Sequence, residues 1–247
     1  MITSLQNNGP QKIRAKVRKA TLLLEKQYGI PRREGPGNPL DILIETILSQ
    51  NTNDQNRDVA YRRLKKRFPS WEDVLGAKTK SIVLAIRPGG LAEQKAKRIH
   101  EILHWIKKRE GRLSLSFIKR MDSEEIKKTI GALKGIGPKT LHCLLLFGLG
   151  REVFPVDTHI LRIGKRLGFI PEWMSAEKAH PWMVPLLPKG KSLSLHLNLI
   201  RFGRSICKAK NPLCSTCFLN KECLHSCHGN IPISSLSLDG RGSACLR

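Results

Sequence analysis

Residues 133–150 read LKGIGPKTLHCLLLFGLG, a glycine-rich turn followed directly by a long apolar run. Gly135 and Gly137 flank one isoleucine, and Pro138 stands where a helix can begin, because proline is favoured at the first helical position. The apolar residues that follow are typical of a buried helix starting near Lys139. Backbone N–H groups at such a turn can bind a phosphate, although a helix-connecting turn with a solvated lysine is the simpler interpretation of these residues alone.

The same helical periodicity continues in both directions along the chain. It is clear in KIRAKVRKATLLLEKQYG (12–29), PLDILIETILSQ (39–50), AEQKAKRIHEILHWIKKR (92–109) and SEEIKKTIGAL (123–133). No segment alternates apolar and polar residues as a strand does, so the sequence predicts an all-α fold with about ten helices. Residues 228–247 lose the periodicity and are rich in serine and glycine, and we expect a flexible tail without an assigned function.

The charge of the chain indicates the class of its partner. Forty-four Lys and Arg against 20 Asp and Glu leave a net charge of +24, spread along the whole sequence. No stretch approaches the roughly 18 consecutive apolar residues of a membrane span, which favours nucleic acid as the polyanionic partner and no membrane. The first residues do not resemble a secretory signal, so we expect a monomer in the reducing cytoplasm, associated with the nucleoid.

A carboxylate that follows the apolar run could act together with Lys139. Asp157 lies in GREVFPVDT (150–158), directly before another helical stretch, where an N-cap is its simplest role. A helix of nine residues rises on the order of 13 Å, and the nine or so residues after it can return ~30 Å when extended. Asp157 can therefore reach Lys139, whose uncharged amine would attack a carbonyl while the carboxylate stabilises positive charge. His159 is interpreted as a packing residue and is not included in the catalytic set.

Four cysteines lie within 17 residues near the end of the chain, at the spacing C-x6-C-x2-C-x5-C. They are Cys207, Cys214, Cys217 and Cys223. Thiolates at this density in a reducing compartment indicate a metal site. Structural zinc sites usually pair two short cysteine hooks, so the single C-x2-C favours a [4Fe–4S] cluster, with zinc as the alternative. Lys208 and Lys210 lie between the first two cysteines and make this loop a basic projection suited to phosphate contact.

Together these motifs resemble the endonuclease III branch of the helix-hairpin-helix DNA glycosylase superfamily. LKGIGPKT is similar to the family hairpin with its lysine, VDTH to its aspartate motif, and the cysteine spacing to that of its cluster. The resemblance covers roughly residues 12–225. It implies a six-helix barrel domain with the hairpin, a second all-α domain that carries the cluster, and double-stranded DNA bound between the two. It also implies catalytic roles for Lys139 and Asp157.

Two further stretches fit the resemblance. PLDILIETILSQNTND (39–54) resembles the family segment that fills the gap left by an extruded nucleotide, which points to Gln50 or Asn51. GGLAEQKAKRI (89–99) resembles the loop that wedges the opposite strand, which points to Leu91. A polar helix end and an inward-packed leucine are the alternatives for these residues. Filling side chains are needed because base extrusion breaks stacking and pairing.

Some residues depart from the family pattern. Pro138 stands where the family commonly has a basic residue, so one phosphate contact of the hairpin is in doubt. The wording SQNTND differs from the commoner form of its segment, which leaves the preferred damaged base open. Adenine glycosylases of the superfamily generally lack a lysine at position 139, so its presence favours a glycosylase that is also a lyase.

The sequence therefore predicts a bifunctional DNA glycosylase and abasic-site lyase, acting on oxidised pyrimidines and cleaving 3′ to the abasic site. The expected domains are residues 41–152 for the six-helix domain, and residues 1–40 with 153–227 for the cluster domain. Two alternatives remain open. One is a glycosylase for mismatched or deaminated bases, and the other is a DNA-binding protein that uses the hairpin only for contact.

Overall fold

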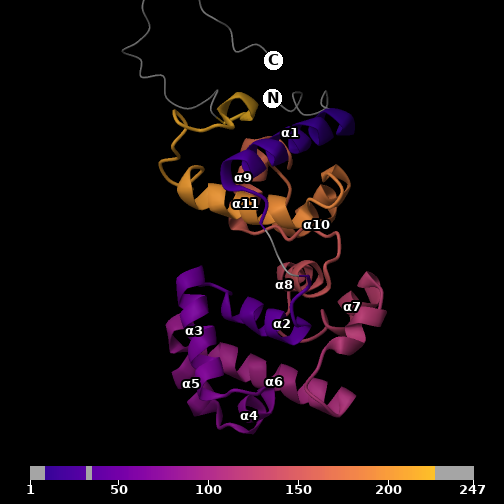
Figure 1. The fold of residues 1–247 in the computed structure, drawn as a ribbon, viewed down its shortest axis with the longest axis vertical. Helices are drawn as coiled ribbons and strands as arrows, with labels where there is room; N and C mark the ends of the chain where they lie inside the picture. Colours follow the sequence, from indigo (N-terminus) through magenta and orange to yellow (C-terminus); the bar gives the residue numbers. More distant parts are fainter. Residues whose placement is uncertain (1–8, 32–34, 226–247) are drawn as a thin grey trace, which may run out of the picture. The chain divides into compact units, whose positions relative to one another are not determined.

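The structure is a computed structural model that describes residues 9–31 and 35–225. All regular secondary structure in these residues is helical, which confirms the all-α prediction (Figure 1). The chain divides into two compact units. We call residues 32–155 the hairpin unit, and residues 1–31 together with 156–247 the terminal unit. No helix in the described part of the chain is both long and apolar enough to span a membrane.

The described residues of the hairpin unit form seven α-helices and three short segments of other helical type. They are α2 (Pro39–Leu48), α3 (Asp54–Arg67), α4 (Trp71–Gly76), α5 (Thr79–Ile86), η1 (Arg87–Gly89), α6 (Ala92–Glu110), η2 (Ser116–Arg120), α7 (Ser123–Thr129), α8 (Pro138–Cys143) and η3 (Leu144–Gly148). The family resemblance implied six helices for this domain. Helix α4 begins at Trp71 because Ser70 and Asp73 form a reciprocal capping box.

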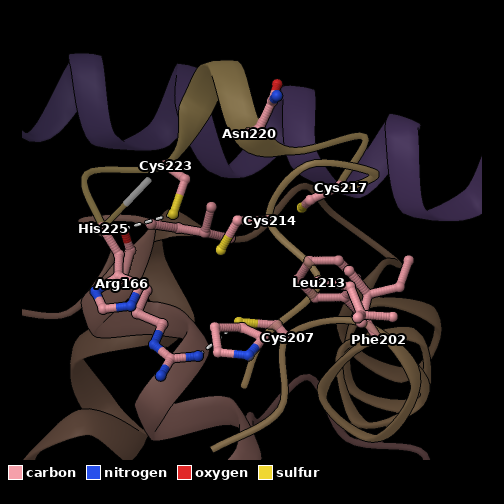
Figure 2. Close-up of a pocket in the computed structure, with 12 residues that line it drawn as sticks. Arg166, Phe202, Cys207, Leu213, Cys214, Cys217, Asn220, Cys223 and His225 are labelled. Carbon is pink, nitrogen blue, oxygen red and sulfur yellow. Dashed lines mark hydrogen bonds between the residues drawn. The ribbon is translucent and has the colours of Figure 1, made fainter. Parts of the chain in front are cut away.

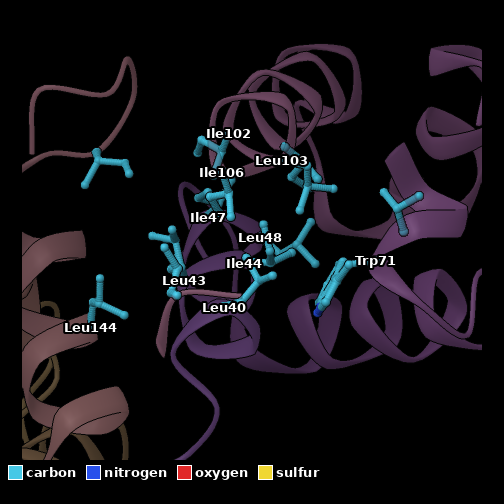
Figure 3. Packing of buried hydrophobic residues seen from close by; sticks show 14 of the residues in the cluster. Leu40, Leu43, Ile44, Ile47, Leu48, Trp71, Ile102, Leu103, Ile106 and Leu144 are labelled. Atoms are coloured by element: carbon cyan, nitrogen blue, oxygen red, sulfur yellow. The ribbon is translucent and has the colours of Figure 1, made fainter. Parts of the chain in front are cut away.

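Helix α2 lies in the middle of the apolar core of the hairpin unit (Figure 3). Its buried face packs against α6, α3, α8 and η3. The residues of this core that Figure 3 labels are Leu40, Leu43, Ile44, Ile47, Leu48, Trp71, Ile102, Leu103, Ile106 and Leu144. Asn38 starts the helix, since its side chain accepts hydrogen bonds from the backbone of Leu40 and Asp41. The core therefore holds the C-terminal end of α2 in place, together with the turn that follows it and carries Gln50 and Asn51.

The predicted glycine turn joins α7 to α8. Gly135 has a φ of +86°, a conformation that other residues rarely adopt, and a Cβ there would lie 1.8 Å from Nε of Arg98. Gly137 has an ordinary φ of −84°, and a Cβ there would meet nothing within 4 Å. Pro138 is the first residue of α8, as the sequence predicted. Only the first of the two glycines is therefore required by the backbone.

The terminal unit combines both ends of the described chain. It contains α1 (Pro10–Tyr28), α9 (Thr158–Arg166), α10 (Ala176–Met183), η4 (Val184–Leu186), α11 (Ser192–Ser205) and η5 (Asn220–Glu222). Helix α11 packs between α1 and α9. Glu25 of α1 pairs with Lys191 at 3.0 Å, and the Asn198 amide donates to the Gly29 carbonyl at 2.9 Å. These polar contacts attach the N-terminal helix to the C-terminal segment.

The boundaries between the units differ from the predicted domain limits. Leu40 is buried in the core of the hairpin unit, and the backbone of Gly37 donates to Phe147, so the segment before residue 41 belongs to that unit. The second boundary falls after Pro155 rather than residue 152, since the Val156 backbone donates to Nδ1 of His180 in the terminal unit at 2.9 Å. The predicted tail, residues 228–247, lies outside the described residues.

The contrast between the two glycines gives a stability prediction. Gly135→Ala places a Cβ in a left-handed conformation against Arg98, and it should lower the free energy of unfolding by about 2 kcal/mol. Gly137→Ala should change it by less than about 1 kcal/mol, because its backbone and surroundings accept a methyl group and only the weaker N-cap preference of alanine opposes it. Urea unfolding of the two variants measures the difference. Equal effects at the two positions would contradict the turn geometry.

Candidate functional site

Lys139 is exposed on the first turn of α8, immediately after the glycine turn. Pro138 supplies the first helical residue, and α8 continues into the π-helical segment η3, whose leucines are buried in the core. The helix is therefore anchored at its far end while its beginning faces solvent. An amine held there is accessible to a partner molecule.

The Gln50 side chain holds the glycine turn against α2 and α6. Its Nε2 donates to the Gly135 carbonyl at 3.1 Å and to Oγ1 of Thr140 at 3.2 Å. Its Oε1 accepts a 2.5 Å hydrogen bond from Arg98. Both polar ends of the amide are thus occupied within the hairpin unit. Of the two residues predicted to fill the gap in DNA, Gln50 is therefore engaged in holding the hairpin.

Asn51 and Leu91 share an unusual backbone conformation. Asn51 is exposed with a φ of +53°, and Leu91 is 51% exposed with a φ of +48°. Left-handed backbone is unfavourable for residues other than glycine and is often found at functional sites. The only other described non-glycine residue with a positive φ is Asn211. The inward-packed alternative for Leu91 is therefore wrong, because half of its side chain faces solvent.

A buried lysine lies between the turns that carry these two residues. Lys95 of α6 is 1% exposed, and its Nζ donates to the carbonyls of Leu48 and Gly89, at 2.7 Å each. Burial lowers the pKa of this ammonium, and the positive charge of Arg98 lowers it further. Lys95 was not among the functional residues predicted from the sequence. The available signal was its position four residues before Ile99 on the buried face of α6.

Asp157 is the N-cap of α9. Its Oδ1 accepts a 2.8 Å hydrogen bond from the backbone of Ile160. Its other carboxylate oxygen, Oδ2, accepts no hydrogen bond within the described residues. The capping role considered from the sequence is therefore present, and it uses one of the two oxygens. Asp157 belongs to the terminal unit, whereas Lys139 belongs to the hairpin unit.

The four cysteines line one pocket of the terminal unit (Figure 2). Its other lining residues include Arg166, Phe202 and Leu213. Burial raises the pKa of the Cys217 thiol, the three other thiols raise it further, and a hydrogen bond from the Leu219 backbone lowers it. Within residues 9–31 and 35–225, no three His, Cys, Asp or Glu side chains form a group suited to a single metal ion.

Two arginines of α9 hold the first part of the cysteine loop. Arg162 donates to the carbonyl of Cys207 at 2.8 Å. Arg166 donates to Sγ of Cys207 at 3.3 Å and to the carbonyl of Lys208 at 2.8 Å. Their helical pattern did not distinguish them from solvated basic residues, so the sequence analysis missed them. Lys208 and Lys210 are exposed on this loop, as a phosphate contact would require.

Comparisons with known proteins agree on the family. Residues 44–183 match the HhH-GPD superfamily of base excision DNA repair proteins. A protein of Arabidopsis thaliana, named as a candidate DNA glycosylase, is 39% identical over 181 residues, which are 73% of this chain and 59% of that protein. The chain thus spans less than two thirds of that relative. Endonuclease III of Thermotoga maritima is 34% identical over 194 residues, which are 78% of this chain and 86% of that protein.

A solved structure supports the same assignment. The trapped covalent intermediate of endonuclease III with DNA superposes with a TM-score of 0.73 and 26% identity, covering 86% of this chain and 96% of that one. The similarity includes residues of both units, because each unit contains about half of the chain and the match covers 86% of it. With the superfamily match over more than half of the residues, the chain belongs to the HhH-GPD superfamily of base excision DNA repair proteins and is similar to endonuclease III within it.

Proposed function

We propose that this protein is a bifunctional DNA glycosylase and abasic-site lyase in which Lys139 is the nucleophile. The observation that carries the proposal is the exposed lysine on the first turn of α8, directly after a hairpin turn that the core holds in place. A lysine that served only for solubility would need no such anchored position. The net charge of +24 suits a DNA substrate, whose phosphates attract basic side chains.

The proposed reaction begins with removal of the damaged base. Asp157 would stabilise the positive charge that develops on the sugar as the base leaves, using the oxygen that does not cap α9. The amine of Lys139 then forms a bond to C1′ and gives up one proton, and the ring oxygen takes up a proton as its bond to C1′ breaks, which leaves a protonated Schiff base. This iminium draws electrons from C2′, so a proton leaves C2′ and the C3′–O bond breaks. The 3′ phosphate departs and the strand is cleaved.

The comparison with endonuclease III supports the covalent step. The solved structure of that protein is a trapped covalent intermediate with DNA. Endonuclease III therefore forms a covalent bond to DNA. We infer that the present chain forms an equivalent bond through Lys139, the lysine of its hairpin motif.

Asn51 and Leu91 are the residues that we propose to enter the duplex. Gln50 is occupied by the hairpin turn, whereas Asn51 is exposed on the same loop. A short amide can replace hydrogen bonds of the extruded base, and the apolar Leu91 can support the stack on the opposite strand. Both side chains belong to the hairpin unit, which also carries Lys139.

The cysteine pocket has the donors that an iron–sulfur cluster requires. Four thiols from one short loop face a common space, and Arg166 donates to one of the sulfurs. Cys207, Cys214, Cys217 and Cys223 would hold a [4Fe–4S] cluster. When bound, the cluster would cross-link a loop that has little apolar core of its own. We therefore assign a structural role to the cluster. No step of the proposed reaction passes through it.

The nucleophile assignment predicts the outcome of borohydride trapping. Lys139→Gln should give no covalent adduct with abasic DNA, because only an amine forms the Schiff base that borohydride reduces. Lys134→Gln removes another exposed lysine of the same hairpin and should keep the adduct. Gel analysis of both variants tests the prediction. An adduct of normal yield with Lys139→Gln would show that another amine reacts.

The carboxylate assignment predicts slow turnover without weaker binding. Asp157→Asn should reduce base removal about 100-fold, because the amide carries no charge to stabilise the sugar. Asparagine is as good an N-cap as aspartate, so the variant should keep its stability. Single-turnover rates, DNA affinity and thermal melting should be measured together. Full activity in this variant would refute the role assigned to Asp157. Tight DNA binding by a wild-type protein that neither removes bases nor forms adducts would favour the DNA-binding protein without catalysis.

The metal assignment predicts a coloured protein. Purified protein should absorb near 400 nm, an approximate region for thiolate-bound clusters, and contain iron. Cys217→Ser should lose the absorption, whereas Cys143→Ser, which changes a buried core residue outside the pocket, should keep it. A colourless protein that contains one zinc ion would overturn the cluster proposal.

The substrate proposal is tested by a panel of duplexes. We expect the fastest base removal and trapping with thymine glycol, an oxidised pyrimidine. Duplexes with uracil or thymine opposite guanine represent the alternative, and a plain abasic site tests the lyase step alone. Reaction with the mismatched bases and not with thymine glycol would replace the first proposal with the second.

A further inference from the structure

Lys95 joins two turns that are far apart in sequence. One of its carbonyl partners, Leu48, is the last residue of α2 and lies three residues before Asn51. The other, Gly89, is the last residue of η1 and lies two residues before Leu91. A single buried ammonium therefore bonds to the backbone two or three residues before each of the residues proposed to enter DNA.

The chemistry of this contact explains why a lysine can be buried there. The last carbonyls of a helix have no partner within that helix, and they form its negative end. The ammonium of Lys95 satisfies one such carbonyl on each side. Among the described residues Lys95 makes no ion pair, so its donors serve the two turns alone. Removing it would leave two buried carbonyls without this donor.

The backbone on either side of the contact must also be held in place. Asn51 and Leu91 both have left-handed φ values, which cost free energy for residues with a Cβ. Such conformations persist when the surrounding structure over-determines them. The turn before Leu91 is closed by a hydrogen bond from the Gly90 N–H to the Arg87 carbonyl at 3.2 Å, and η1 packs against α3 and α5. The contact with Lys95 adds the restraint that joins this turn to the end of α2.

We propose that Lys95 is a positioning residue that fixes the turn of Asn51 and the turn of Leu91 relative to each other, so that both side chains enter the duplex together when the base is extruded. The inference rests on the proposed function. Lys95 itself is buried and does not touch DNA. Substitution of Lys95 should therefore affect only the steps that need Asn51 and Leu91 in the duplex.

Lys95→Met tests the proposal, because methionine keeps an unbranched apolar stem without a donor. The variant should lose about tenfold or more of kcat/KM for base removal from a duplex, since misplaced contact groups reduce rates strongly. It should keep trapping on single-stranded abasic DNA, which needs no extrusion. A 2-aminopurine base opposite the lesion should show a reduced fluorescence change on binding.

The matched control is Leu103→Ala, a cavity-forming change in the core face of the same helix. It should lower thermal stability without a selective loss on duplex substrate. If Lys95→Met does not fold, Lys95→Gln keeps an uncharged NH2 donor group on a shorter side chain and should show the same selective loss to a smaller degree. Equal losses on duplex and single-stranded substrates, or the same selectivity in Leu103→Ala, would overturn the positioning role.

Combined substitutions test whether Lys95 acts through the two turns. Once Asn51→Ala and Leu91→Ala are present together, adding Lys95→Met should reduce kcat/KM on duplex DNA by less than about twofold. The effects of substitutions at coupled residues are not additive. A further tenfold loss would contradict the proposal.

Amide hydrogen exchange separates this inference from the proposed function. Exchange at residues 49–52 and 90–92 should be faster in Lys95→Met and unchanged in Leu103→Ala. If the wild-type protein neither removes bases nor forms adducts, the proposed function fails while the exchange result still tests the restraint. If the wild type is active and Lys95→Met shows normal exchange and duplex activity, the restraint is wrong.

Discussion

The hydrogen bond from the Gln50 amide to the Gly135 carbonyl is the contact on which the candidate site depends. Gly135 adopts its left-handed conformation without a side chain that would clash with Arg98, and Arg98 donates to the oxygen of the same Gln50 amide. The turn is thereby attached to the buried helix α2 and to α6. Lys139 is the second residue of the next helix, so its place is set by the same contact. The proposed nucleophile thus derives its position from the core of the hairpin unit.

Helix α9 has a comparable role in the terminal unit. Asp157 caps its beginning, while Arg162 and Arg166 bind the cysteine loop near its end. Nine helical residues span about 13 Å, so the pocket and the carboxylate are coupled through one rigid element. A group bound to the four thiols would secure the end of the helix opposite to Asp157. This gives the proposed cluster a structural role without a part in the reaction.

Features that depend on local chemistry could be predicted from the sequence. The glycine turn, the start of α8 at Pro138 and the cysteine spacing each follow from neighbouring residues. Features that depend on contacts between distant segments could not. Gln50 and Asn51 are adjacent polar residues, and only the fold shows that Gln50 binds Gly135. In the sequence Lys95 is one of many lysines, and only the fold shows that it bonds to the ends of α2 and η1. Similarly, only its burial in the core shows that Leu40 belongs to the hairpin unit.

Peptide mapping of the borohydride-reduced adduct tests the central claim most directly. After digestion of the cross-linked wild-type protein, mass spectrometry identifies the residue that carries the sugar remnant. We expect the remnant on Lys139, because this is the lysine held on the first turn of the hairpin helix. A remnant on any other lysine or on the N-terminal amine would contradict the proposed mechanism.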